Sequence, residues 1–231
     1  MWGREVDGLK LTFHLAGINN QNFLMRDEET GSYWQQISGL AVSGPLAGKA
    51  LRLIPSDELT FALWKAEQPR GTVVKDAQKY AAEYAAKNWD VRMKKAPTVL
   101  SYAEPGRTPR DLMIGIRAFG AARAFPFDLV IQQKLVQDRV GSEPVLLMVG
   151  PDGASVRAFV ARVPGVAEFY RTPEAILIDS VTGGKWNFQG CRVEGGGCLQ
   201  RVEIVKDYWF DWRHYNPKTT VYGTPSMKKS E

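Results

Sequence analysis

The sequence contains few of the side chains from which metal sites and nucleophile sites are usually built. Its 231 residues include only two histidines and two cysteines. Zinc sites use three or four His, Cys, Asp or Glu ligands at characteristic spacings, and neither His14 nor His214 has such neighbours along the chain. The Gly-x-Ser-x-Gly, His-Glu-x-x-His and P-loop motifs do not occur. The sequence therefore predicts no bound metal and no cofactor, and it assigns no residue a catalytic role.

Long apolar runs and concentrated positive charge are missing as well. No apolar run approaches the ~18 residues typical of a membrane-spanning helix, so we expect no membrane span. The 30 Lys and Arg exceed the 25 Asp and Glu, giving a net charge of +5, but the basic residues are scattered. A nucleic-acid-binding protein usually gathers its charge on one face, so we expect no nucleic-acid partner. The N-terminus also lacks the pattern of a signal peptide.

A turn-rich segment occurs twice in the chain. Residues 26–48 read RDEETGSYWQQISGLAVSGPLAG, and residues 178–197 read IDSVTGGKWNFQGCRVEGGG. The shared positions are Asp27 and Asp179, Thr30-Gly31 and Thr182-Gly183, Trp34 and Trp186, and Gly39 and Gly190. Downstream, Trp64 and Trp212 each precede a proline by five residues. Matches in one order indicate an internal duplication.

Short apolar segments between glycine-rich turns favour a β-rich α+β fold with short antiparallel strands, a few helices and two related, duplicated units. Leu9 to Leu15 alternates apolar and polar residues, which predicts a half-buried strand with His14 on its polar face. The clearest helical pattern runs from Ala77 to about Met93, where tyrosines and alanines recur at helical spacing. We expect the alanine face, centred on Ala81, to pack between the two units.

The repeat divides the chain into three predicted parts. They are a first, incomplete repeat unit at 1–75, a helical linker and Pro-rich connection at 76–110, and a second repeat unit at 111–231. Residues 112–178 precede Asp179, whereas only residues 1–26 precede Asp27. We therefore expect the counterpart of a longer segment to be missing at the N-terminus. The first strand would then be an edge strand, which favours a protein partner or self-association through that edge.

Candidate binding residues lie in and beside the first copy of the repeat. The predicted ligand-binding residues are His14, Arg26, Asp27, Trp34, Gln35 and Gln36. Trp34 would provide a stacking wall for a polar pocket. The alternative is that Asp27 and Thr30 only stabilise the turn, with Trp34 in the core. The glutamine pair is the better functional candidate, because the second copy has Asn187-Phe188 in its place.

Cys191 and Cys198 flank a glycine-rich loop. They form either a disulfide that closes this loop or two unlinked thiols. Their spacing is not that of a redox Cys-x-x-Cys motif.

Four stretches carry a family resemblance. They are FLMRDEETGSYWQQISGLAVSGPLAGKAL, TFALWKAEQP, IGIRAFGAARAFPF and QDRVGSEPVLLMV. Together with the repeated turn, they resemble the domain of unknown function 3179 family, an uncharacterised bacterial family. Many members look exported, which favours the disulfide. Members often carry a Cys-x-x-Cys upstream of the strand matching Leu9 to Leu15, and a His in the helix matching Phe127 to Val136. This chain begins after the position of the Cys-x-x-Cys motif, so it is N-terminally incomplete relative to typical members. At the position of the family's His it has Ile131-Gln132-Gln133.

We interpret the chain as a non-catalytic binding or scaffold module of an extracytoplasmic bacterial protein, periplasmic or extracellular in its full-length form. The alternative is an enzyme, a hydrolase or redox-linked protein, with a polar site around Asp27, Gln35 and Gln36. An enzyme should gather polar side chains with shifted pKa values in a deep pocket. A binding module should instead present an exposed apolar or aromatic patch.

Overall fold

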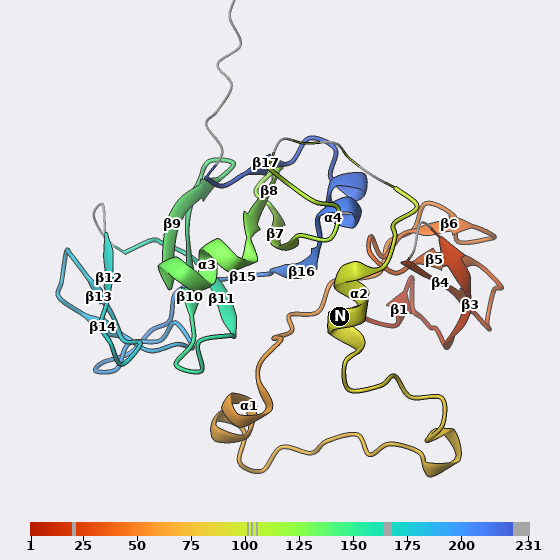
Figure 1. The fold of residues 1–231 in the computed structure, drawn as a ribbon, viewed down its shortest axis with the longest axis horizontal. Helices are drawn as coiled ribbons and strands as arrows, with labels where there is room; N and C mark the ends of the chain where they lie inside the picture. Colours follow the sequence, from red (N-terminus) through yellow and green to blue (C-terminus); the bar gives the residue numbers. More distant parts are fainter. Residues whose placement is uncertain (20–21, 101, 103, 105, 164–167, 224–231) are drawn as a thin grey trace, which may run out of the picture. The chain divides into compact units, whose positions relative to one another are not determined.

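The computed structural model describes residues 1–19, 22–100, 102, 104, 106–163 and 168–223. Over those ranges the chain forms strands β1 to β17, helices α1 to α4 and one 3-10 turn, η1 (Figure 1). Most strands are short and pair antiparallel in several small sheets. The predicted β-rich α+β fold is therefore confirmed. Among the described helices, none has the length and apolar character needed to cross a membrane.

The described residues belong to two units. Unit 1 comprises Met1–Ser56, Thr98–Pro109 and Tyr208–Pro217, and unit 2 comprises Asp57–Pro97, Arg110–Asp207 and Lys218–Glu231. Each unit is thus assembled from segments that are distant in the sequence. The predicted division into 1–75, 76–110 and 111–231 follows the sequence repeat, whereas these two units are defined by their compactness. The predicted division therefore stays a prediction.

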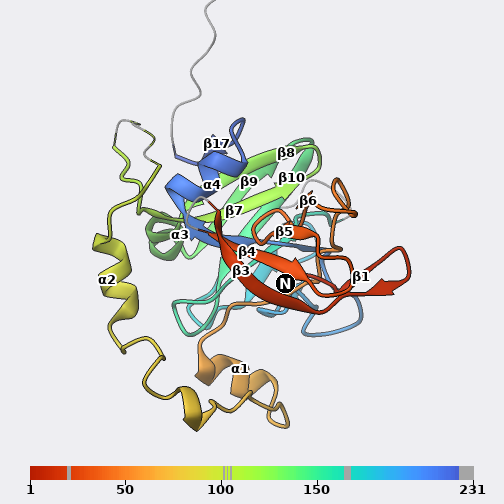
Figure 2. The same ribbon diagram turned by 90° about the vertical axis from the view of Figure 1, so that its right-hand side faces the viewer.

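Unit 1 is built on a four-stranded antiparallel sheet in the order β3-β4-β5-β6 (Figure 2). Its strands are β3 (Phe13–Asn19), β4 (Asn22–Asp27), β5 (Tyr33–Gln35) and β6 (Ala41–Ser43). A hairpin of β1 (Glu5–Val6) and β2 (Leu9–Lys10) precedes the sheet. The same unit includes helix α4 (Trp209–Tyr215). Its core consists of Val6, Leu11, Trp34, Ala41 and Leu51.

The predicted alternation from Leu9 to Leu15 is only partly right. Leu11 is fully buried and His14 is exposed, as the pattern indicates, but Leu9 and Leu15 are 45% and 61% exposed. The chain leaves strand conformation at residues 11–12, between β2 and β3. Because the segment is not one strand, its apolar residues do not share one buried face.

Unit 2 contains three further sheets. The first has the order β16-β7-β8-β17, the second β15-β11-β10-β9 and the third β12-β13-β14. Their strands are β7 (Leu112–Ala118), β8 (Ala121–Pro126), β9 (Leu135–Val140), β10 (Glu143–Val149), β11 (Val156–Val160), β12 (Phe169–Arg171), β13 (Leu177–Asp179), β14 (Lys185–Trp186), β15 (Arg201–Val202), β16 (Val205–Tyr208) and β17 (Thr220–Val221). Helix α3 (Phe127–Gln133) ends where Lys134 adopts a left-handed backbone conformation. Apolar residues of these sheets form two buried clusters, one around Phe125 and one around Phe159.

One continuous helix from Ala77 to Met93 is not present, so that prediction is wrong. The structure has α1 (Phe61–Glu67), then η1 (Gln78–Tyr80) and α2 (Trp89–Lys95). No residue from 71 to 97 is buried, and Ala81 is exposed, so the predicted packing of the alanine face is also wrong. Helical spacing identifies an apolar stripe but does not supply a surface to cover it. Without that surface, the segment lacks the tertiary packing from which most helical stability in proteins comes.

Candidate functional site

Asp27 is buried at the end of β4 and is surrounded by hydrogen-bond donors. Its Oδ1 accepts from the backbone N–H groups of Thr30 at 2.6 Å and Gly31 at 3.1 Å. Its Oδ2 accepts from Nε1 of the buried Trp34 at 2.7 Å. The Thr30 hydroxyl donates to the same carboxylate. Asp27 therefore joins the turn to the core through its side chain.

The second aspartate turn has matching threonine and tryptophan donors. Asp179 Oδ1 accepts from the Thr182 backbone N–H at 2.6 Å, and Oδ2 accepts from Trp186 Nε1 at 3.0 Å. The glycine after each threonine has a positive φ, +73° at Gly31 and +66° at Gly183, a conformation that glycine adopts without steric cost. The two turns are thus closed by the same side-chain chemistry.

Both aspartates are held in the charged form. Burial alone would raise the pKa of Asp27, but hydrogen bonds from Trp34, Thr30 and Gly31 outweigh it and lower the pKa below its usual range. Burial likewise opposes ionisation of Asp179, but hydrogen bonds from Thr182, Trp186 and Val181 lower its pKa to about 2. A general acid or base works best with a pKa near the operating pH. Neither carboxylate has that property.

Gln35 takes part in a different set of contacts from its neighbour Trp34. Its Nε2 donates to Asn19 Oδ1 at 3.3 Å and to the Tyr215 hydroxyl at 3.0 Å, while its Oε1 accepts from Ser38 at 2.7 Å. Successive strand residues point to opposite faces of a sheet, so Gln35 faces α4 whereas Trp34 faces the core. Gln35 therefore links the sheet of unit 1 to α4.

Two more polar pairs involve α4 of unit 1. Asn22 Nδ2 donates to Oδ1 of the buried Asp211, and the Tyr102 hydroxyl lies 2.9 Å from His214 Nδ1. Asp211 and Tyr215 are not among the residues predicted from the sequence to bind a ligand, because their hydrogen-bond partners lie far away along the chain.

The other predicted residues lie apart from these contacts. His14 and Arg26 are exposed and sit opposite each other in the β3–β4 register. Arg26 donates to the Gly31 carbonyl at 3.3 Å, and its guanidinium lies 5.8 Å from the Tyr33 ring centre. Gln36 is exposed. The structure therefore brings Asp27 and Trp34 together but does not gather all six predicted residues around one point. Among the described residues, no group of three or more His, Cys, Asp or Glu is placed to hold a metal.

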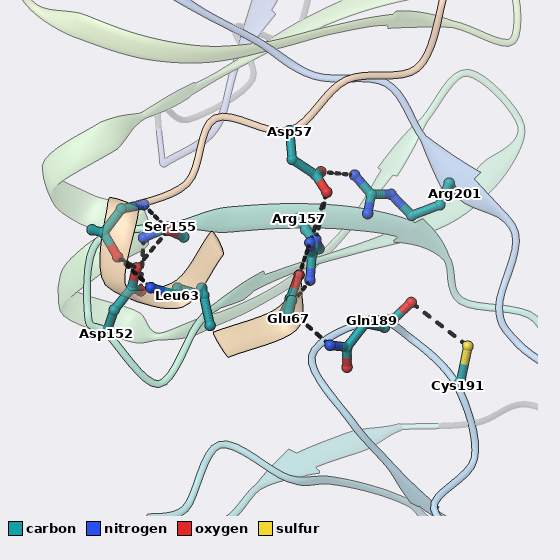
Figure 3. A network of polar contacts seen from close by, with 10 residues as sticks. Asp57, Leu63, Glu67, Asp152, Ser155, Arg157, Gln189, Cys191 and Arg201 are labelled. Carbon is teal, nitrogen blue, oxygen red and sulfur yellow. Dashed lines mark hydrogen bonds and ion pairs between the residues drawn. The ribbon is translucent and has the colours of Figure 1, made fainter. Parts of the chain in front are cut away.

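A charge network of unit 2 surrounds Arg157 on β11 (Val156–Val160) (Figure 3). Arg157 is only 3% exposed, and its Nη2 donates to Asp57 and to Glu67, each at 2.7 Å. Its guanidinium also lies 4.5 Å from the Phe188 ring centre. Burial alone would lower the pKa of Arg157, but its hydrogen bonds with Glu67 and Asp57 raise it. A second arginine, Arg201, pairs with Asp57. The network therefore holds both ends of the segment that carries α1.

A hydrogen-bonded group at the start of α1 reinforces this attachment. The Thr60 hydroxyl donates to Asp152 Oδ2 at 2.6 Å, and the same oxygen accepts from Ser155 Oγ at 2.6 Å. Burial opposes ionisation of Asp152, but the hydrogen bonds from Ser155 and Thr60 lower its pKa to about 2. The charged groups around Arg157 and Asp152 pair with neighbouring residues of the same unit, so we interpret them as stabilising the attachment of α1.

Cys191 and Cys198 are joined by a disulfide, with an S–S distance of 1.96 Å. The two residues also form an antiparallel bridge, so the covalent bond closes the base of the loop at 192–197. Asn187 Oδ1 accepts from the Cys191 backbone N–H at 3.0 Å, which continues the turn that follows Trp186.

A family model described as "Protein of unknown function (DUF3179)" matches residues 1–219. The match spans both aspartate turns and the Arg157 network. No curated protein and no solved structure matches the chain.

Proposed function

The chain belongs to the DUF3179 family, and from this premise we propose that it is a non-catalytic binding module that docks another polypeptide on strand β3. The family has no assigned activity, so the proposal rests on the residues of unit 1. The single observation that carries it is an edge strand with exposed apolar side chains.

β3 is a terminal strand in the order β3-β4-β5-β6 (Figure 2). Leu15 and Ile18 on this strand are 61% and 70% exposed, and Phe23, the β4 partner of Ile18, is 50% exposed. An edge strand presents backbone N–H and C=O groups to which an extended peptide can add. Exposed apolar side chains beside those groups provide the contacts for such a peptide.

The polar residues of the aspartate turns favour binding over catalysis. The Asp27 carboxylate accepts hydrogen bonds from its own turn and from Trp34, and its pKa is lowered. The alternative, an enzyme around Asp27, Gln35 and Gln36, needs these side chains to converge. Gln35 contacts Tyr215 instead, and Gln36 is exposed.

We also propose that the two aspartate turns are copies of one duplicated element. Met25 pairs with Trp34 and Leu177 pairs with Trp186, while Phe13 and Phe169 lie opposite the two aspartates. Each phenylalanine meets its tryptophan edge to face, at 5.8 Å in the first copy and 6.5 Å in the second. The same register and the same ring contact support a common origin.

The Cys191–Cys198 disulfide supports an extracytoplasmic location for the module. Disulfides form and persist in oxidising compartments and are rare in reducing ones. A binding module that acts in such a compartment is the function that these observations support best.

The docking proposal is tested by replacing Ile18 with lysine in the full chain. A charge on the edge strand should oppose strand addition, so concentration-dependent association in sedimentation velocity should weaken. Val42→Lys is the matched control, because Val42 is 51% exposed on β6, the other terminal strand of the same sheet. In hydrogen exchange, the amides of residues 13–19 should become more protected as the wild-type protein associates. Equal effects of the two variants would contradict docking on β3.

A further inference from the structure

The segment from Asp76 to Lys95 carries apolar side chains that the structure leaves exposed. Tyr80, Tyr84 and Trp89 are 45%, 49% and 52% exposed. Helical structure is limited to the 3 residues of η1 and the 7 residues of α2. An amphipathic helix normally packs its apolar stripe against another surface. No described part of the chain buries a residue of this segment.

The charges of the segment are spaced for a helix. Glu83 and Lys87, and likewise Asp90 and Lys94, are four residues apart with the acidic residue first, the more favourable order on a helix. On a continuous helix these four residues and Lys79 would occupy one narrow face. That face suits contact with water. The opposite side carries the alanine row in the N-terminal half of the segment, and Asn88, Arg92 and Lys95 in the C-terminal half.

The opposite side suits close contact with a second helix. Ala77, Ala81 and Ala85 recur every fourth residue, and Tyr80 and Tyr84 lie beside them. Rows of residues four apart form the ridges and grooves by which helices pack together. Small side chains in such a row bring two helix backbones close, and the neighbouring aromatic rings then supply most of the buried area.

We propose that residues 76–95 become a continuous helix when they pair, antiparallel, with the same segment of a second copy of this chain. Residues 76–86 carry one basic and two acidic residues, a net charge of −1. Residues 87–96 carry four basic residues and one acidic residue, a net charge of +3. Antiparallel pairing sets each −1 half against a +3 half, whereas parallel pairing sets like charges together. Antiparallel helices also place opposite dipole ends side by side.

Charge and composition favour a second copy over an anionic lipid surface. A membrane would attract the +3 half, but the acidic half would gain nothing from it. The alanine row offers little area to lipid, whereas it fits a helix–helix contact. Each aromatic ring of about 200 Å² is half exposed, so three rings add only about 300 Å² per copy. Stable interfaces bury roughly 1,200–2,000 Å² in total, so the pair is weak and forms at high protein concentration.

The test uses the full-length protein in parallel measurements of mass and helicity. Sedimentation velocity and circular dichroism at 222 nm are recorded over a wide range of concentration. Dimer formation and added helicity should rise together. Replacing Tyr80 and Tyr84 with serine should raise the dimer dissociation constant at least about tenfold, as truncation of central aromatic contacts does. Val74→Ser is the matched control, because Val74 is 97% exposed but lies outside the segment.

Cross-linking tests the antiparallel orientation. Ala85→Cys lies near the middle of the segment, so two antiparallel copies should join through a short bismaleimide. Ala77→Cys lies near one end and should join poorly to its counterpart. Equal cross-linking at both positions would indicate a parallel pair and overturn the proposed geometry.

Three results would overturn the pairing itself. The first is helicity that does not change with concentration. The second is helicity that rises only with phosphatidylserine vesicles, which would assign the segment to a membrane surface. The third is a dimer that Ile18→Lys abolishes and the two tyrosine changes leave intact, which would assign self-association to β3 alone. A dimer lost in the tyrosine variant and kept in Ile18→Lys supports the helix pair, independently of docking on β3.

Discussion

At the scale of single residues, the two buried aspartates stabilise tight turns by accepting hydrogen bonds from backbone N–H groups within the turn. Asp27 and Asp179 each accept from a threonine backbone N–H and from an indole N–H. A buried carboxylate is unfavourable unless donors surround it. The threonine and tryptophan are therefore part of the same structural element as the aspartate.

Removing the indole donor should destabilise either turn. Trp34→Phe and Trp186→Phe keep most of the buried ring but leave Oδ2 of the aspartate without its indole partner. Hydrogen bonds to charged groups contribute ~1.5–3 kcal/mol, so each variant should lower the free energy of unfolding by about that much in urea titrations. Trp89→Phe, at a ring that is 52% exposed, serves as the control and should change it little. A result equal to the control would show that the indole contact is dispensable.

The second prediction at this scale concerns acid stability. The folded-state pKa of Asp179 is about 2, below its usual 3.8, because hydrogen bonds from Thr182 and Trp186 outweigh the effect of burial. A carboxyl group with a lowered folded-state pKa stabilises the fold above its unfolded-state pKa, and this contribution is lost as pH falls through the folded-state pKa. Stability should therefore decrease between about pH 4 and about pH 2.

Asp179→Asn removes the ionisable group and should flatten this part of the profile, even though the variant is less stable at neutral pH. The measurement is the free energy of unfolding in urea at several pH values. An unchanged slope would mean that other carboxylates, such as Asp152 with its pKa of about 2, account for the acid sensitivity.

The sequence predicted the aspartate turns but not the contacts of Gln35. The pattern Asp-x-x-Thr-Gly-x-x-Trp is local, and each of its hydrogen bonds spans seven residues or fewer. The Gln35–Tyr215 contact spans 180 residues. Local turn chemistry is visible in a single sequence, whereas contacts at that distance depend on the packing of whole elements.

At the scale of secondary-structure elements, helix α1 is held by charge as well as by apolar contact. No residue of α1 is fully buried, but Leu63 packs against the cluster around Phe159. The ion pairs of Arg157 with Asp57 and Glu67 hold both ends of the segment that carries α1 (Figure 3). This network could not be predicted from the sequence, since the arginine lies 90 residues or more from each carboxylate. Periodicity was also misleading for residues 77–93, because it describes a face but not the surface that covers it.

Breaking the Arg157 network should be costly. Arg157→Met leaves Asp57 and Glu67 without their shared cation, and removing one partner of a buried ion pair costs about 3–5 kcal/mol. Because both carboxylates keep some exposure, we expect the lower end of that range in urea unfolding. Arg162→Met is the matched control. The Arg162 side chain, which pairs with Glu143, is 69% exposed, and exposed ion pairs contribute about 1 kcal/mol or less to the free energy of unfolding. Equal losses in both variants would show that the network adds no special stability.

At the scale of the whole molecule, the order of segments along the chain differs from their grouping in space. The chain passes between the two units at residues 56/57, 97/98, 109/110, 207/208 and 217/218. A repeat detected in the sequence can show where similar turns lie, but it cannot show that a C-terminal helix completes an N-terminal sheet. The hydrogen bonds of α4 with Asn22 and Gln35 therefore could not be predicted from the sequence pattern.

The interleaved chain predicts that residues 1–56 do not fold alone. This fragment contains the core around Trp34, but it lacks α4 and with it the partners of Asn22 and Gln35. A domain of about 60 residues buries only about 60% of its unfolded surface and is marginal even when complete. The isolated fragment should therefore show poorly dispersed amide signals by NMR and no cooperative thermal transition.

The full chain with Tyr215→Phe is the companion measurement, because it removes the hydroxyl that contacts Gln35 and keeps the rest of α4. That variant should fold and lose only about 1 kcal/mol, as expected for one neutral hydrogen bond. A well-dispersed spectrum and a cooperative transition for residues 1–56 would show that the sheet of unit 1 is self-sufficient. In that case α4 would be an accessory that caps the sheet rather than a part that the sheet requires to fold.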